Sequence, residues 1–251
     1  MNIKYLIFDL DDTLLRKNKT ISDFTVEVLK EAQNAGLKVV FNTSRSFQNS
    51  KSYYDLVNAD YGIFNGGCQI VDKNGKNLYS STISAVETQT ITKYLNTVCE
   101  KISVQTPDSF LASDKEYKSQ NAIWTDFSEG YFGESYKILC LSMDHDFIEG
   151  IANKYNLEFQ NYLNKGWHRL SVKGASKWNG ILHFLEVVNG KAEECATFGD
   201  DFGDQEMIEK AGMGVAMANS QPVVLEHAPN VTLSNEEDGV AVFIKNKILG
   251  K

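Results

Sequence analysis

The stretch YLIFDLDDTLL, residues 5–15, places an apolar run directly before three aspartates in four positions, Asp9, Asp11 and Asp12. Such a run is typical of a buried strand, and in open parallel sheets ligands bind beyond the carboxyl ends of the strands. Carboxylates this close repel one another, which drives at least one of them toward its protonated form unless a cation is present. The stretch therefore raises the hypothesis of a cation site at a strand end.

A second stretch, CATFGDDFGD at residues 195–204, repeats the pattern, with a predicted strand ending at Asp200 and further acids at Asp201 and Asp204. If the two strands are neighbours in one sheet, Asp9, Asp11 and Asp200 come together. Hard oxygen ligands of this kind suit magnesium.

The acids have two other interpretations. Aspartate also favours helix caps and solvated turns. A calcium-binding EF-hand loop fails on its spacing, because the position of its glycine holds Leu14 and that of its closing glutamate holds Thr20 when counted from Asp9. The pair of acidic strand ends favours the magnesium site.

Candidate phosphate ligands follow a different strand and begin a helix. Thr43 ends the predicted strand 37–43 and Ser44 follows it, and their hydroxyl and N–H groups can hold phosphate oxygens there. Lys177 begins a predicted helix, and an ammonium there is unfavourable unless an anion is also present. Taken alone, Lys177 is better explained as a solvated surface lysine. The complete set indicates a site for a small phosphate.

Composition restricts the class of partner. The chain has 251 residues, is 42% hydrophobic and 23% charged, and carries a formal net charge of -8, which argues against nucleic acid as a partner. The apolar run at the N-terminus is too short for a signal peptide, and no stretch is long enough to span a membrane. Four scattered cysteines are typical of a reducing compartment, so we expect a cytoplasmic protein. The oligomeric state stays open.

The alternation of elements predicts one α/β core with an insertion. Strands alternate with helices up to residue 67 and again from residue 176, which is typical of a parallel sheet. The middle section mixes helices with short strands, and its first helix is expected at 84–102, opened by a capping box of Ser84 and Glu87. We therefore expect a core of residues 1–81 and 174–251 and an α+β domain of residues 82–173.

These motifs, in this order, resemble the haloacid dehalogenase (HAD) superfamily, in particular its Cof-type, subclass IIB phosphatases. DLDDTLL matches the motif DxDxT, Thr43 in NTSR matches TGR, Lys177 in GASKWNG matches the lysine motif, and GDDFGD matches GDxxND. The resemblance implies a Rossmann-like parallel-sheet core, a C2-type cap and magnesium-dependent phosphatase activity.

The resemblance also implies roles for the acids. Asp9 would be the nucleophile that forms an aspartyl-phosphate, and Asp11 would be the general acid and base. Magnesium would be held by Asp9, Asp200 and the backbone carbonyl of Asp11. Asp204 would orient Lys177 or a metal-bound water, and Arg45 would contact the substrate or form a structural ion pair.

The implied phosphate-binding positions include two departures from the family. These positions are the backbone N–H of Leu10, Thr43, Ser44, Lys177 and Gly203. Ser44 stands where the family has glycine, and Gly203 stands where it has an asparagine that helps to hold the phosphate. Either Gln205 or a water replaces that asparagine, or the turn needs a glycine because its φ is positive.

The function expected is hydrolysis of a small phosphomonoester, such as a sugar phosphate, with the cap selecting the substrate. Candidate cap residues for that selection are Trp124, Trp167, His168 and Arg169. The alternatives are a phosphomutase of the phosphomannomutase type and a binding protein with a decayed site. Release of free phosphate without a bisphosphate activator would separate hydrolysis from mutase activity.

Overall fold

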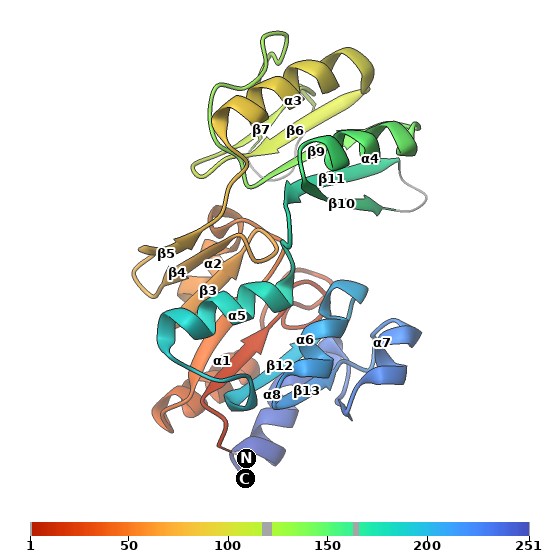
Figure 1. The fold of residues 1–251 in the computed structure, drawn as a ribbon. Helices are drawn as coiled ribbons and strands as arrows, with labels where there is room; N and C mark the ends of the chain where they lie inside the picture. The colour runs from red at the N-terminus through yellow and green to blue at the C-terminus, as the bar shows by residue number, and fades with distance from the viewer. Residues whose placement is uncertain (1, 117–121, 163–165, 251) are drawn as a thin grey trace. The chain divides into compact units, whose positions relative to one another are not determined.

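A computed structural model describes residues 2–116, 122–162 and 166–250. The chain divides into two compact units, the first made of Met1–Ser80 with Ser176–Lys251 and the second of Ser81–Ala175 (Figure 1). The first unit therefore contains both acidic strand ends and Lys177. Of the described helices in either unit, none has the length and apolar character that a membrane crossing needs.

The first unit is built on one sheet of eight strands in the order β14-β13-β12-β1-β2-β3-β4-β5. The six strands from β14 to β3 run parallel, while β4 and β5 extend the sheet as an antiparallel hairpin. The mixed α/β class with a parallel sheet is as predicted. The strands are β1 (Tyr5–Phe8), β2 (Lys38–Asn42), β3 (Tyr61–Phe64), β4 (Gln69–Asp72), β5 (Asn77–Ser80), β12 (Cys195–Gly199), β13 (Met213–Ala216) and β14 (Asn230–Val231).

Helices cover both faces of this sheet, so its central strands are apolar on both sides. In β1, Leu6 and Phe8 pack toward α1, α2 and α8, whereas Tyr5 and Ile7 pack toward α5 and α6. This two-sided burial explains why residues 5–8 form an uninterrupted apolar run. The helices are α1 (Asp23–Asn34), α2 (Phe47–Leu56), α5 (Lys177–Val188), α6 (Gln205–Lys210), α7 (Pro222–His227) and α8 (Gly239–Phe243).

The second unit is a six-stranded sheet, in the order β10-β11-β9-β6-β7-β8, with two helices on one face (Figure 1). Apolar side chains of β6, β9, β10 and β11 form one core with those of α3 and α4. The elements are α3 (Ala85–Val98), β6 (Lys101–Gln105), β7 (Phe110–Ala112), β8 (Ile123–Trp124), β9 (Lys137–Leu141), α4 (His145–Lys154), β10 (Leu157–Tyr162) and β11 (Trp167–Val172).

One helix predicted in the second unit ends earlier in the structure than expected. The helix expected at 84–102 stops at Val98, because the backbone becomes extended at Cys99 and the strand β6 follows. Ile102 and Val104 are buried on the helix side of that strand, with the period of two that marks a half-buried strand. The capping box at the start of the helix is present as predicted.

Two glycines fix the start of α5 against the turn between β3 and β4. At Gly67, whose φ is +97°, a Cβ would lie 2.2 Å from the Ser176 carbonyl oxygen, and a Cβ on Gly180 would lie 2.7 Å from the Gly67 Cα. The backbones of turn and helix are therefore in direct contact. Because Lys177 belongs to this first turn of α5, the contact sets the position of its side chain.

We expect Gly180→Ala to destabilise the first unit, because the added methyl group meets backbone and overpacking typically costs about 1–3 kcal/mol. Gly150→Ala is the matched control: Gly150 lies in α4, where a Cβ would meet nothing within 4 Å, and alanine in a helix interior is favoured by about 1 kcal/mol. Urea denaturation of both variants measures the difference. Equal stability of the two variants would contradict this account of the α5 contact.

Candidate active site

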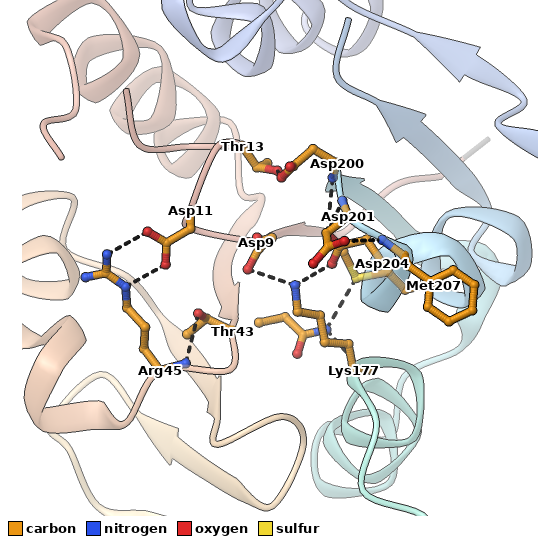
Figure 2. A network of polar contacts seen from close by, with 12 residues as sticks. Asp9, Asp11, Thr13, Thr43, Arg45, Lys177, Asp200, Asp201, Asp204 and Met207 are labelled. Carbon is orange, nitrogen blue, oxygen red and sulfur yellow. Dashed lines mark hydrogen bonds and ion pairs between the residues drawn. The ribbon is translucent and has the colours of Figure 1, made fainter. Parts of the chain in front are cut away.

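The two acidic stretches meet because β1 and β12 are parallel neighbours. Phe8 is paired with Phe198, so Asp9 and Asp200 both leave the sheet at its carboxyl edge (Figure 2). One carboxylate oxygen from each of Asp9, Asp200 and Asp204 lies within 4.8 Å of the others. The sequence-based expectation that Asp9 and Asp200 come together is correct. The third carboxylate is that of Asp204 and not that of Asp11.

Lys177 lies inside this acidic group. Its Nζ is 2.8 Å from Asp9 Oδ1 and 2.5 Å from Asp204 Oδ1, and the side chain is buried. Burial lowers the pKa of Lys177, but the charges of Asp204 and Asp9 outweigh that effect and raise it above its ordinary value. Lys177 is therefore charged and buried, and it connects the end of β1 to the turn after β12; its interpretation as a solvated surface lysine is wrong.

Asp204 is held on both of its carboxylate oxygens. Oδ1 accepts the hydrogen bond from Lys177, and Oδ2 accepts hydrogen bonds from the backbone N–H groups of Asp200 and Asp201, each at 3.1 Å. Asp204 is fully buried. Its contacts make it an anchor for Lys177 and for the turn that carries Asp200.

One ammonium does not balance three carboxylates, of which Asp9 and Asp204 are buried and Asp200 is half-buried. Burial raises the pKa of Asp9 to about 7, with Lys177 opposing the shift and Asp204 adding to it. Burial also raises the pKa of Asp200 to about 7, although Thr13 Oγ1 donates a hydrogen bond to it at 2.6 Å. A second cation would relieve this imbalance, and the all-oxygen donor set fits magnesium.

Asp11 faces away from this group. Arg45 donates to its two oxygens from Nε at 2.7 Å and from Nη2 at 2.6 Å (Figure 2). Lys19 Nζ also lies 2.8 Å from Asp11 Oδ1. Burial raises the pKa of Asp11, but the hydrogen bonds from Arg45 and Lys19 outweigh it and hold the pKa below its usual value. Asp12 is exposed, with a φ of 58°. Mutual repulsion of the three neighbouring acids is therefore not what raises the pKa of Asp9.

The predicted phosphate positions emerge at the same edge of the sheet. Phe8 of β1 is paired with Phe41 of β2, and Leu10 and Thr43 each lie two residues after these paired positions. Both are buried, and Thr43 Oγ1 accepts a hydrogen bond from the Arg45 N–H at 3.2 Å. Ser44 is exposed beside them. The N–H of Thr43 donates to the Ile63 carbonyl at 2.9 Å, so its hydroxyl is the group suited to a ligand.

Gly203 does not need to be glycine for conformational reasons. It lies in the turn Phe202–Asp204, its φ is outside the left-handed region, and a Cβ there would meet nothing within 4 Å. The predicted alternative of a positive φ is therefore wrong. Gln205 does not replace the family's asparagine in this structure, because its amide donates to Glu209 at 2.7 Å.

Two polar residues of the site were not predicted from the sequence. Thr13 holds Asp200, and Asn42 Nδ2 donates to the Lys177 carbonyl at 3.1 Å. Both are buried polar side chains. Their positions in the sequence were the only indication of a role: Thr13 belongs to the first acidic stretch, and Asn42 is the last residue of a buried strand. Their partners lie more than 130 residues away in the sequence, so the contacts themselves could not be predicted.

Known proteins resemble this chain over nearly its full length, in both sequence and fold. A sequence profile of haloacid dehalogenase-like hydrolases matches residues 6–244. The 5-amino-6-(5-phospho-D-ribitylamino)uracil phosphatase YitU of Bacillus subtilis is 28% identical over 96% of each chain. A haloacid dehalogenase-like hydrolase from Bacteroides thetaiotaomicron superposes with a TM-score of 0.83 at 22% identity, covering 97% of this chain and 99% of the other. The HAD subclass IIB sugar phosphatase BT4131 superposes with a TM-score of 0.80 at 23% identity, covering 97% and 98%.

The raised pKa of Asp200 predicts how its charge affects stability. Because the folded pKa of about 7 lies above the ordinary 3.8, ionised Asp200 destabilises the metal-free fold fully above pH 7, and the penalty disappears as the pH falls toward 4. Asp200→Asn should therefore raise the Tm of metal-free protein near pH ~8 and lose this gain at about pH 4. Magnesium should raise the Tm of the wild type more than that of the variant.

Differential scanning calorimetry at the two pH values, with and without magnesium, measures both effects. Glu226→Gln is the control, because Glu226 is exposed on α7 and its substitution removes the same charge. A Tm for Asp200→Asn below that of the wild type at the higher pH would show that ionised Asp200 stabilises the fold, contrary to this account.

Proposed function

The chain belongs to the haloacid dehalogenase-like hydrolases, and from that premise we propose that it is a magnesium-dependent phosphatase acting through an aspartyl-phosphate. The observation that carries the proposal is the position of Asp9, a buried carboxylate at the end of the central strand β1 and 2.8 Å from a charged lysine. A carboxylate so placed can attack a phosphorus atom whose oxygens the neighbouring groups hold.

In the first step, an oxygen of Asp9 forms a bond to phosphorus while the bond from phosphorus to the ester oxygen breaks. The ester oxygen takes a proton from Asp11 and leaves as an alcohol. Lys177, the Thr43 hydroxyl and the backbone N–H groups of Leu10 and Ser44 hold the phosphoryl oxygens as their charge redistributes. In the second step, Asp11 takes a proton from a water that attacks phosphorus, which releases phosphate and restores Asp9.

Asp9, Asp200 and the backbone carbonyl of Asp11 would hold magnesium, and its charge would offset repulsion between the attacking carboxylate and the anionic phosphate. Burial, with the charge of Asp204 adding to it, raises the pKa values of Asp9 and Asp200, and a cation held by both carboxylates would favour their ionised forms. We assign Asp204 to orienting Lys177, since both of its oxygens already accept hydrogen bonds.

Asp11 must change partners to act as the acid. In the described conformation it is ionised and bound by Arg45 and Lys19, which suits a base and not a proton donor. We propose that Asp11 leaves Arg45 and binds a proton when an ester occupies the site. Arg45 thus acts as a positioning residue for the resting enzyme.

The substrate proposed is a sugar phosphate or a similar small metabolite, and the second unit is proposed to act as the cap that selects it. The chain returns to the first unit at Ser176, one residue before Lys177, so the insertion is joined directly to the site. A curated relative is named for a ribityl phosphate ester, which belongs to this class of compound. The cytoplasmic location stays a prediction.

Substitution of Asp9 and Asp11 tests their proposed roles as nucleophile and as general acid and base. Asp9→Asn should abolish release of phosphate from p-nitrophenyl phosphate, because an amide does not form the acyl phosphate. Asp11→Asn should lower kcat by about 10²–10⁴-fold, the usual contribution of general acid and base catalysis. Near-normal turnover by Asp9→Asn in the presence of magnesium would rule out the assigned nucleophile.

Substitution of Gly203 by asparagine is expected to strengthen phosphate binding. Asparagine fits there without strain and would donate to the phosphate, and a hydrogen bond to a charged group is worth about 1.5–3 kcal/mol. Gly203→Asn should therefore lower the inhibition constant of inorganic phosphate, or raise kcat/KM, by about tenfold to a hundredfold at most. Gly203→Ala is the control without a donor. Identical kinetics for the two variants would show that no such hydrogen bond forms.

A further inference from the structure

The second unit contains two cysteines that lie against the same core. Cys140 is in β9 and is fully buried, and Cys99 is the residue that ends α3 and is half-buried. Both side chains pack in the apolar cluster that α3 and α4 form with the strands of this unit. The two thiols therefore lie on the helix side of the same sheet.

Strand register brings the two cysteines together. Cys140 is paired with Ile102 of β6, three residues after Cys99. The chain joins the sheet directly after α3, because the Glu100 N–H donates to the Leu141 carbonyl at 3.0 Å. Cys99 thus lies beside the end of β9, and its thiol interacts directly with that of Cys140. Because 41 positions separate the two cysteines in the sequence, their spacing alone does not indicate a pair.

Their surroundings make the two thiols unequal. The hydrogen bond with Cys140 lowers the pKa of the Cys99 thiol, although burial opposes that change. The same contact and burial raise the pKa of the Cys140 thiol. The thiolate is the nucleophilic form of cysteine, so Cys99 is the more reactive of the two and is also the one that solvent reaches.

A zinc site does not explain the pair. A structural zinc ion takes about four ligands from cysteine and histidine. Among the described residues, the one group that brings three candidate metal ligands close together belongs to the first unit, as described above. In the second unit, His145 Nδ1 and His168 Nε2 instead lie 3.0 Å from each other. The chemistry that suits Cys99 and Cys140 is therefore that of two neighbouring thiols.

We propose that Cys99 and Cys140 are a redox-sensitive pair, which hydrogen peroxide converts to a disulfide between the end of α3 and β9. This inference does not depend on the proposed phosphatase function. It assigns a site of reversible modification to the second unit, apart from the group around Asp9 and Lys177.

The reaction has two steps. The Cys99 sulfur loses its proton and attacks one oxygen of the peroxide, the O–O bond breaks, and the other oxygen leaves as water with that proton. The Cys140 sulfur then attacks the sulfur of the resulting sulfenic acid, the S–O bond breaks, and the hydroxyl leaves as water with the Cys140 proton. Two thiols are thus oxidised while one peroxide is reduced to two waters.

The disulfide would close a loop of the chain that contains β6, β7 and β8. A cross-link of this kind stabilises a fold chiefly by restricting the unfolded chain. The oxidised protein should therefore have a higher Tm than the reduced protein. Amide hydrogens in the last turn of α3 should also exchange more slowly, because local opening there would be restrained.

Peptide mapping of the full-length protein tests the proposal directly. The reduced protein would be treated with hydrogen peroxide, alkylated, digested without a reductant and analysed by mass spectrometry. We expect one linked pair of peptides, containing Cys99 and Cys140, that dithiothreitol separates, and a fall from four titratable thiols to two. Cys195 is the internal control, because it is buried and burial raises its pKa to about 12, so it should stay reduced.

Variants assign the role of each thiol. Cys140→Ala should let the sulfenic acid accumulate at Cys99, where dimedone traps it, and Cys99→Ser should leave Cys140 unoxidised. Peroxide should raise the Tm of the wild type and of the control variant Cys195→Ala, and should not raise that of Cys99→Ser. A wild type in which Cys99 and Cys140 stay unlinked, a disulfide that joins two chains, or an equal rise in the Tm of Cys99→Ser would overturn the proposal.

Discussion

The buried contact between Lys177 and the carboxylates of Asp9 and Asp204 is the interaction on which the site depends. It joins Asp9, at the end of β1, to α5, which begins at Lys177, 168 positions after Asp9 in the sequence. It also joins α5 to the turn after β12, which contains Asp204. The contact leaves the group negatively charged overall, because one ammonium meets three carboxylates. Burial raises the pKa values of Asp9 and Asp200, the charge of Asp204 adds to both shifts, and a divalent cation would offset the excess negative charge.

The fold restricts where such a group can form. β1 lies between β12 and β2 in a parallel sheet, so three segments that are distant in the sequence end at one edge. The glycine contact between the β3–β4 turn and α5 then brings the lysine to that edge. Helices cover both faces of the sheet, and at its carboxyl edge Asp9 and Asp204 are buried while Asp200 is half-buried.

Much of this arrangement was predictable from the sequence, for identifiable reasons. Apolar runs and the strand–helix alternation indicated the parallel sheet, and the family resemblance, now confirmed by the profile match, ordered the motifs around it. The orientation of Asp11 was not predictable, because its partners Arg45 and Lys19 are brought to it by the tertiary fold. Thr13 was missed for the same reason, and β6 was missed because a good helix pattern precedes it without a break.

The most direct test of the account is the chemical fate of Asp9 during turnover. Wild-type enzyme or Asp11→Asn would be mixed with substrate, quenched in acid within the first turnover, digested with pepsin and mapped by mass spectrometry. The account predicts a phosphoryl group on the peptide that contains residues 5–15, at Asp9, present with magnesium and absent when the metal is chelated. Phosphate released without any phosphorylated Asp9, or phosphorylation at a different residue, would contradict it.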